Sequence, residues 1–233
     1  MNVEPAGSAG PQAAAAPVPS RAARAGLVVI GIGAWFLTQS LIGQRTPPEA
    51  GIHDGMHVLL SPWHAYLLAH TACANALMIV SSAFIDGLAI FVLLRSVLGP
   101  TVRPFVGLFL LFALRQLCQA LCSLPEPHQM IWHEPGFPAL LVTYGVATDL
   151  FFSGHTSVAV YGALELGRLG RKWLAAGIVI AVFEMLTVLT LRAHYTMDVF
   201  AALMTALVVA RIAERISPAL DGALARAFGK RAG

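Results

Sequence analysis

The feature that most constrains this chain is a series of six apolar stretches, each close to the roughly 20 residues with which an α-helix crosses a lipid bilayer. The stretches cover residues 26–43, 70–94, 104–124, 150–167, 173–191 and 197–213. Only 12% of the residues are charged and 57% are hydrophobic, whereas a soluble domain carries about 25% charged residues. No strand pattern competes, so the sequence predicts an all-α fold, a six-helix integral membrane bundle.

The apolar stretches divide the chain into three parts. Residues 1–25 are rich in Ala, Pro, Gly and Ser and predict a disordered tail, residues 26–213 form a six-span membrane domain, and residues 214–233 form a basic tail. A cleaved signal peptide is not expected, because the first apolar stretch is too long and no small-residue cleavage site follows it. The three cysteines fall in apolar stretches, where they are expected to pack as small hydrophobic side chains.

The basic residues predict how the helices are oriented in the membrane. If the N-terminus is cytoplasmic, twelve of the fifteen Lys and Arg residues fall in cytoplasmic segments, as the positive-inside rule requires. The exceptions are Arg45, Arg115 and Arg192, which lie with all eight histidines on or near the periplasmic or lumenal side. The net charge of +3 is small and its basic residues lie between apolar stretches, so nucleic acid is not an expected partner. We therefore expect cytoplasmic termini and an active site on the outer face.

Two polar motifs lie at the open end of a predicted helical hairpin. The motif S-G-H-T (153–156) begins the fourth apolar stretch, where the free N–H groups and dipole of a helix start favour phosphate. His194 and Asp198 are four residues apart and would share one face of a helix, where the carboxylate can orient the imidazole. A basic turn at residues 168–172 connects the two apolar stretches that separate these motifs. The hairpin would therefore return both motifs to one side of the membrane.

These motifs and the outward arginines define a candidate site for phosphoryl transfer. The catalytic candidates are His155, His194 and Asp198. The candidates for binding the substrate phosphate are Ser153, Gly154, Arg192 and Arg115, since a guanidinium group suits phosphate oxygens. The residues expected to support them are Asp149, Tyr195 and Glu184. This set requires no metal ion and no other cofactor.

Each motif also has a structural interpretation. S-G-H-T is a common helix start and a His-x-x-x-Asp pair is often a solvated salt bridge, so the catalytic assignment depends on their occurring together. Asp86 and Glu184 lie within apolar stretches, and a structural pair between Arg115 and Glu184 would compete with phosphate binding. The spacing of three histidines allows a zinc site that no cysteine or carboxylate cluster supports: His53, His57 and His64.

Three blocks of sequence resemble a known family of membrane enzymes. Arg115 followed by L-P-E-P (124–127) is similar to the R-x(8)-L-P-x-P block of sphingomyelin synthases, and D-L-F-F-S-G-H-T (149–156) and H-Y-T-M-D-V (194–199) are similar to their two catalytic motifs. Two details resemble the plant phosphatidylcholine:diacylglycerol cholinephosphotransferases more than the sphingomyelin synthases. They are the segment F-F-S-G-H (151–155) and Arg192, two residues before H-Y-T. The likeness covers roughly residues 60–205. The chain thus resembles the lipid phosphotransferase branch of the type-2 phosphatidic acid phosphatase superfamily.

The resemblance implies a type-2 phosphatidic acid phosphatase-like core and a specific reaction. His194 would attack the donor phosphorus and carry the headgroup, and Asp198 would orient it. His155 would protonate the leaving diacylglycerol and then deprotonate the acceptor. The implied donor is a glycerophospholipid, and phosphocholine or a related headgroup would pass to a lipid hydroxyl such as that of diacylglycerol or ceramide.

Two alternative functions are a lipid phosphate phosphatase and a non-enzymatic membrane scaffold. The hydrolase branch carries K-x(6)-R-P and S-R-x(5)-H-x(3)-D blocks, but here Ser96 stands at the lysine position and Val188 at the first arginine position of the second block. The intact histidines and Asp198 argue against a scaffold. The headgroup, the acceptor, the membrane and the oligomeric state are not specified by the sequence.

Overall fold

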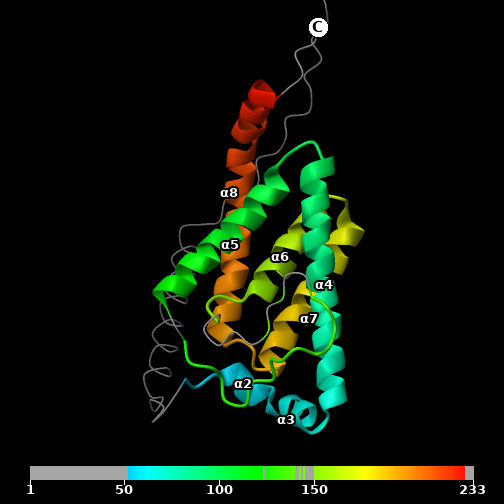
Figure 1. Cartoon of the computed structure of the whole chain (residues 1–233), viewed down its shortest axis with the longest axis vertical. Coiled ribbons are helices and arrows are strands. Elements are labelled where there is room, and N and C mark those ends of the chain that lie inside the picture. The colour runs from blue at the N-terminus through cyan, green and yellow to red at the C-terminus, as the bar shows by residue number, and fades with distance from the viewer. Residues whose placement is uncertain (1–51, 123, 140–141, 143, 145–149, 229–233) are drawn as a thin grey trace, which may run out of the picture. The chain divides into compact units, whose positions relative to one another are not determined.

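The computed structural model describes residues 52–122, 124–139, 142, 144 and 150–228 (Figure 1). Within these residues the chain is all-helical and contains no strand. The helices are α2 (Gly55–Leu59), α3 (Ser61–Ala69), α4 (Thr71–Leu98), α5 (Arg103–Leu121), α6 (Gly154–Gly167), α7 (Arg171–Thr190) and α8 (Thr196–Phe228). The predicted tail at 1–25, the first apolar stretch at 26–43 and Asp149 lie outside the described residues.

Four of these helices are long and apolar enough to cross a membrane: α4, α5, α7 and α8. The all-α prediction is therefore confirmed, and these four helices account for four of the six predicted spans. The fourth predicted span is the shorter helix α6, whose 14 residues extend only about 21 Å. Its preceding residues, 150–153, are not helical.

Helix α6 lies at the centre of the bundle. It packs against α4, α5, α7 and α8 (Figure 1). Eleven of its residues are buried. Small residues permit this close packing: a Cβ added to Gly177 of α7 would lie 2.6 Å from the Cα of Ala163, and one added to Gly107 of α5 would overlap the Tyr161 ring. The central helix is therefore held by backbone-to-backbone approach as well as by apolar contact.

The hairpin of α6 and α7 has the predicted arrangement. The chain turns between Gly167 and Arg171 through Gly170, whose φ of 134° is readily adopted only by glycine. Since the two helices run in opposite directions, the start of α6 and the end of α7 lie at the same end of the bundle. The amide of Ser153 donates to the carbonyl of Asp198 over 3.2 Å, so the two motifs are in direct contact.

A network of ion pairs joins the helices at the end of the bundle opposite the two motifs. Arg103 of α5 makes two hydrogen bonds to Glu165 of α6, at 3.1 and 2.8 Å, and Glu165 is only 2% exposed. Arg168 contacts Glu165 at 3.5 Å and also pairs with Glu214 of α8. Three helices are thereby joined through one buried carboxylate.

The last helix is longer than the sequence predicts. The sixth span was expected to end at residue 213 and to be followed by a basic tail, but α8 continues to Phe228. Asp221 on this extension accepts a hydrogen bond of 2.9 Å from the amide of Val102, which precedes α5. The residues 214–228 therefore continue the helix and contact the rest of the bundle, and residues 229–233 lie outside the described range.

Candidate functional site

His194 lies on the tight turn between α7 and α8. The turn includes Arg192, whose φ of 55° is left-handed, and His194 comes two residues before the start of α8. Its Nδ1 is 3.7 Å from Oδ2 of Asp198, and the two residues are 6% and 0% exposed. The expectation that both residues occupy one helix face is wrong in detail, because His194 precedes the helix and Asp198 reaches back from its first turn.

Asp198 also organises the start of α8. Its Oδ2 accepts the amide of Tyr195 over 2.8 Å, the contact that an acidic side chain in the first turn makes in a capping box. A carboxylate is favoured here because the helix dipole is positive at this end. The sequence spacing therefore identified the His194–Asp198 contact, but the capping role of Asp198 was missed.

His155 lies on the first turn of α6, close to the same turn. Ser153 caps this helix by accepting the amide of Thr156 over 3.3 Å. His155 is 7% exposed, lies within electrostatic range of His194 and Arg115, and meets the edge of the Trp132 ring with a centroid separation of 5.2 Å. The structure thus brings the two predicted catalytic histidines into one buried region.

Arg115 reaches the same region from α5. Its Nε donates to the carbonyl of Phe152 over 2.9 Å, and a Cβ added to Gly154 would lie 3.3 Å from this nitrogen. The guanidinium therefore lies over the first residue of α6. The alternative pair with Glu184 is not formed, because Glu184 accepts a hydrogen bond of 2.6 Å from Ser81 and has no ion pair with Arg115.

A loop crosses the turn and fixes it from one side. Nη1 of Arg192 donates to the carbonyl of His128 over 3.0 Å, and the Tyr195 hydroxyl donates to the carbonyl of Pro125 over 3.1 Å. The amide of Ile131 donates to the carbonyl of Leu191 over 2.9 Å. Arg192 and Tyr195 are therefore both hydrogen-bonded to the loop.

Asp54 fixes the turn from the other side, and sequence reasoning missed it. Its Oδ1 accepts the amide of Met56 over 2.9 Å, which caps α2, and the hydroxyl of Thr196 over 2.6 Å. Its Oδ2 accepts the amide of Thr196, also over 2.6 Å. Burial raises the pKa of Asp54, but the hydrogen bonds from Thr196 and the amide of His57 outweigh it, so the pKa lies below its usual value. One carboxylate thus caps two helices that are far apart in the sequence.

His57 contacts the candidate nucleophile through the backbone. Its Nε2 donates to the carbonyl of His194 over 2.9 Å, and its ring stacks on that of Tyr195 with a centroid separation of 5.6 Å. His64 similarly donates from Nδ1 to the carbonyl of Thr190 over 2.8 Å. The zinc alternative is not supported, since no group of three or more metal-ligating side chains occurs in the part of the chain that the structure describes.

Five buried polar atoms at the site have no hydrogen-bond partner among the described residues. They are His155 Nε2, Thr156 Oγ1, Arg192 Nε, His194 Nδ1 and Asp198 Oδ1. Buried polar atoms are nearly always paired in folded proteins, so such a concentration is typical of a place that receives a polar ligand. Nitrogen and hydroxyl donors predominate in the group, and they are suited to an anion such as phosphate.

The remaining predicted residues are less informative. Asp149 lies outside the described residues, and Asp86 of α4 is half-buried. Trp132 and Asp54 are additions that only the structure supplies. Asp54 followed by Gly is a helix-start pattern, but nothing in the sequence indicates that it also caps a helix 142 residues later.

The site coincides with the part of the chain that matches a known family. The model of the AtPDCT1/2 family matches residues 53–215, more than two thirds of the chain and the whole segment from Asp54 to Asp198. Searches of curated proteins and of solved structures find no match. This membership supports a membrane-associated lipid enzyme resembling a phosphocholine transferase. The chain belongs to the AtPDCT1/2 family, that of the plant phosphatidylcholine:diacylglycerol cholinephosphotransferases.

Proposed function

We propose that this protein transfers phosphocholine, or a closely related phosphorylated headgroup, from a glycerophospholipid to the hydroxyl of a second lipid. The observation that carries the proposal is the cluster of unpaired buried polar atoms shared by His155, His194 and Asp198. Family membership favours phosphatidylcholine as donor and diacylglycerol as acceptor. Ceramide is a second acceptor to be tested.

The first half-reaction breaks the bond between phosphorus and the diacylglycerol oxygen. With Nδ1 of His194 protonated toward Asp198, the lone pair of Nε2 attacks the phosphorus and forms an N–P bond. The departing oxygen keeps the electrons of its bond to phosphorus, and His155 supplies a proton to it. The products are diacylglycerol and a headgroup covalently bound to His194.

The second half-reaction reverses these roles with another alcohol. His155, now neutral, removes the proton of the acceptor hydroxyl, and the oxygen attacks the phosphorus. The N–P bond breaks, and its electrons return to Nε2 of His194. We expect Arg115 and the amides at the start of α6 to stabilise the phosphate oxygens, because both supply donors to an anion.

The chain lacks two cationic groups of the hydrolase branch, and this favours transfer over hydrolysis. A phosphate monoester carries close to two negative charges near neutral pH, whereas a phosphodiester carries one. The hydrolase branch binds its monoester with additional Lys and Arg side chains, but in this chain Ser96 and Val188 occupy two of those Lys and Arg positions. The site also borders the apolar residues Phe152 and Val199, which favour a lipid hydroxyl over water.

Headgroup-labelled phosphatidylcholine tests the proposal directly. Purified protein in lipid vesicles should convert the label into new phosphatidylcholine when a diacylglycerol of distinct chain composition is added, and into another labelled lipid if ceramide serves. Adding the acceptor should raise headgroup turnover, because water is a poor competitor in an apolar site.

Phosphatidic acid provides the counter-test. We expect phosphate release from this monoester to be about 100-fold slower than headgroup transfer, because one missing phosphate-binding group typically costs about that factor. Rapid phosphate release that no lipid alcohol affects would instead establish the lipid phosphate phosphatase. Absence of turnover with every donor would favour the scaffold.

A further inference from the structure

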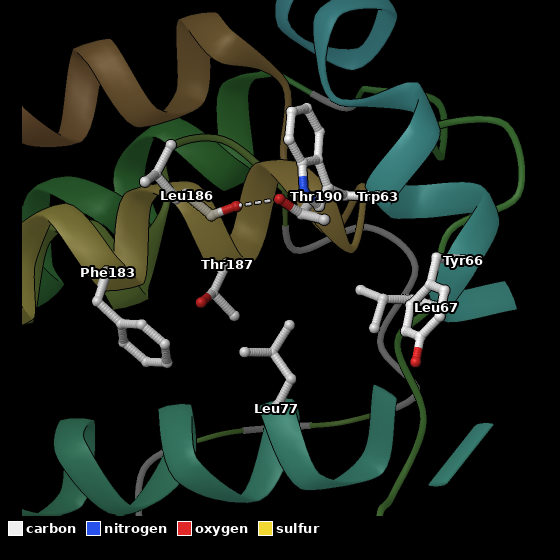
Figure 2. Close-up of a pocket in the computed structure, with 8 residues that line it drawn as sticks. All are labelled: Trp63, Tyr66, Leu67, Leu77, Phe183, Leu186, Thr187 and Thr190. Carbon is white, nitrogen blue, oxygen red and sulfur yellow. Dashed lines mark hydrogen bonds between the residues drawn. The ribbon is translucent and has the colours of Figure 1, made fainter. Parts of the chain in front are cut away.

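A cavity of about 280 Å³ lies between α3, α4 and α7 (Figure 2). Its apolar walls include Leu67 of α3, Leu77 of α4, and Phe183 and Leu186 of α7. We call this the α3/α4/α7 groove. It is separate from the cluster of polar atoms around His194.

Apart from Trp63 and Tyr66, the groove offers almost no polar group to a ligand. Two threonines line it, but the Thr190 hydroxyl already donates to the carbonyl of Leu186 over 2.7 Å, as the dashed line in Figure 2 shows. Thr187 is only 3% exposed. A ligand held here must therefore be a hydrocarbon, since a polar ligand would lose its hydrogen bonds to water without replacing them.

The deeper end of the groove is closed by contacts between α4 and α7. Ser81, one turn beyond Leu77, donates to Glu184 over 2.6 Å, and the rings of Phe84 and Phe183 meet edge to face at 5.6 Å. These contacts join the two helices where the groove ends. The space is therefore short and bounded rather than a continuous gap between spans.

The other end is rimmed by two exposed aromatic side chains of α3. Trp63 is 61% and Tyr66 52% exposed, and both line the groove. Trp and Tyr are enriched at the level of the lipid headgroups, where one part of the ring is apolar and another is wet. The groove walls belong to α4 and α7, which are apolar enough to span a membrane. In a bilayer we therefore expect the aromatic rim at the level of the headgroups and the walls among the lipid tails.

The groove adjoins, through Thr190, the turn that carries His194. Thr190 lines the groove and is the last residue of α7, four residues before His194. Its carbonyl accepts a hydrogen bond of 2.8 Å from His64 of α3. A lipid with its phosphorus beside His194 could therefore place a tail along the groove.

We infer that the α3/α4/α7 groove holds an acyl chain of the glycerolipid substrate while its headgroup reacts at His194. This inference rests on the proposed function, because it assigns the tail of the same substrate. The groove of about 280 Å³ is lined almost entirely by apolar side chains. An extended hydrocarbon chain is narrow and needs only apolar contact, so it is the occupant that this lining suits.

Photocrosslinking tests the occupant. Phosphatidylcholine with a diazirine in the middle of one acyl chain is incorporated into vesicles with the His194→Ala protein, which leaves the lipid intact, and the labelled residues are identified by mass spectrometry. Labelling should concentrate on Leu77, Phe183 and Leu186. Adding Leu77→Trp should reduce it about tenfold, since excluding two methylene groups from apolar contact changes binding by roughly that factor. The matched control is Ile90→Trp, on a 46% exposed position of α4 outside the groove.

Activity of the proteins that retain His194 separates this inference from the proposed function. Leu77→Trp should raise KM for long-chain substrate about tenfold, and the rise should be smaller for short-chain substrate, while Ile90→Trp matches the parent protein. Two outcomes would refute the acyl-chain site while leaving the proposed function intact. In one, the protein transfers the headgroup but the label spreads evenly over all lipid-facing residues. In the other, Leu77→Trp changes neither the labelling nor the chain-length preference. Groove labelling without any transfer overturns the function and leaves a tail-binding site that is not a substrate site.

Discussion

At the scale of single residues, the candidate nucleophile depends on contacts made by its neighbours. His194 is held through its carbonyl by His57, and Asp198 lies 3.7 Å from its ring while binding the amide of Tyr195. Asp198 therefore has two effects, one on the imidazole and one on the helix start. Removing its charge should affect both, which makes the choice of substitution important.

Replacing His194 and Asp198 separates covalent chemistry from orientation. His194→Ala should form no headgroup adduct, whereas Asp198→Asn should still form it, at least about 100-fold more slowly, because the imidazole loses its orienting anion. His155→Ala should form adduct slowly and fail to release it to an acceptor. Rapid quenching with headgroup-labelled donor measures the adduct, and normal turnover by His194→Ala would refute the mechanism.

Asp54 should affect both stability and catalysis. Asp54→Asn replaces one of the two accepting oxygens by an NH2 group, which cannot accept from Met56 or Thr196, and should cost about 1 kcal/mol of unfolding free energy, together with a lower kcat because the His194 turn is less well held. Since the pKa of Asp54 is lowered in the folded protein, its stabilisation is fully present above the ordinary value of 3.8 and is lost as the pH falls through the lowered pKa. The stability difference between parent and variant should therefore shrink in that acidic range.

A carboxylate far from the site provides the control for Asp54. Asp221 also accepts a backbone amide, that of Val102, but at the opposite end of the bundle. Asp221→Asn should leave kcat unchanged. Circular dichroism follows the denaturation of the two variants, and steady-state kinetics gives their kcat. An equal loss of kcat in both would show that Asp54 does not act on catalysis through the His194 turn.

At the scale of helices, the central helix α6 depends on close approach to α7. The position of Gly177 leaves no room for a side chain, because its Cβ would lie 2.6 Å from the Cα of Ala163, which is backbone and cannot rotate away. Gly87 of α4 has no atom within 4 Å of its Cβ position. The two glycines are therefore a matched pair, one crowded and one open.

Substitution of these glycines by alanine should give opposite results. Gly177→Ala should destabilise the protein by about 1–3 kcal/mol through overpacking. Gly87→Ala should be neutral or stabilising by up to about 1 kcal/mol, because alanine favours a helix. Thermal unfolding in detergent measures both effects, and equal Tm values for parent and Gly177→Ala would argue against the close contact of α6 with α7.

The helical hairpin could be predicted from sequence, but the segments that cover the site could not. Apolar spans of membrane length and a basic turn at 168–172 suffice to bring His155 and His194 to one end. The loop containing Pro125 and Ile131 has no periodicity, and its hydrogen bonds to the turn are made by its backbone carbonyl and amide groups, which carry no side-chain signature. The length of α6 was overestimated for a related reason: residues 150–153 are apolar but not helical.

At the scale of the whole molecule, the charges at the two ends of the bundle differ. The site end contains the histidines, Arg115 and Arg192, and the other end contains the network of Arg103, Glu165 and Arg168. We propose that the second end faces the cytoplasm, because twelve of the fifteen basic residues lie in segments assigned to that side. The site then faces the periplasm or a lumen.

Accessibility to an impermeant maleimide tests this orientation. In a protein whose three native cysteines are replaced and which is inserted in a bacterial inner membrane, Glu126→Cys on the loop over the site should react in intact spheroplasts. Lys172→Cys, on the turn at the other end, should react only after the membrane is opened. Both positions are exposed, so a difference reports sidedness. The reverse pattern would place the candidate site in the cytoplasm.

The shared cap at Asp54 has a consequence for biosynthesis. Asp54 is separated by 142 residues from Thr196, whose amide and hydroxyl it accepts. The ribosome delivers the α2 segment to the membrane long before α8 is made. The Asp54 carboxylate therefore lacks Thr196 as a partner while α4, α5, α6 and α7 are inserted. The turn bearing His194 is completed only when the last helix arrives. The ordered turn at the candidate site is therefore expected only in a chain whose final helix has been inserted.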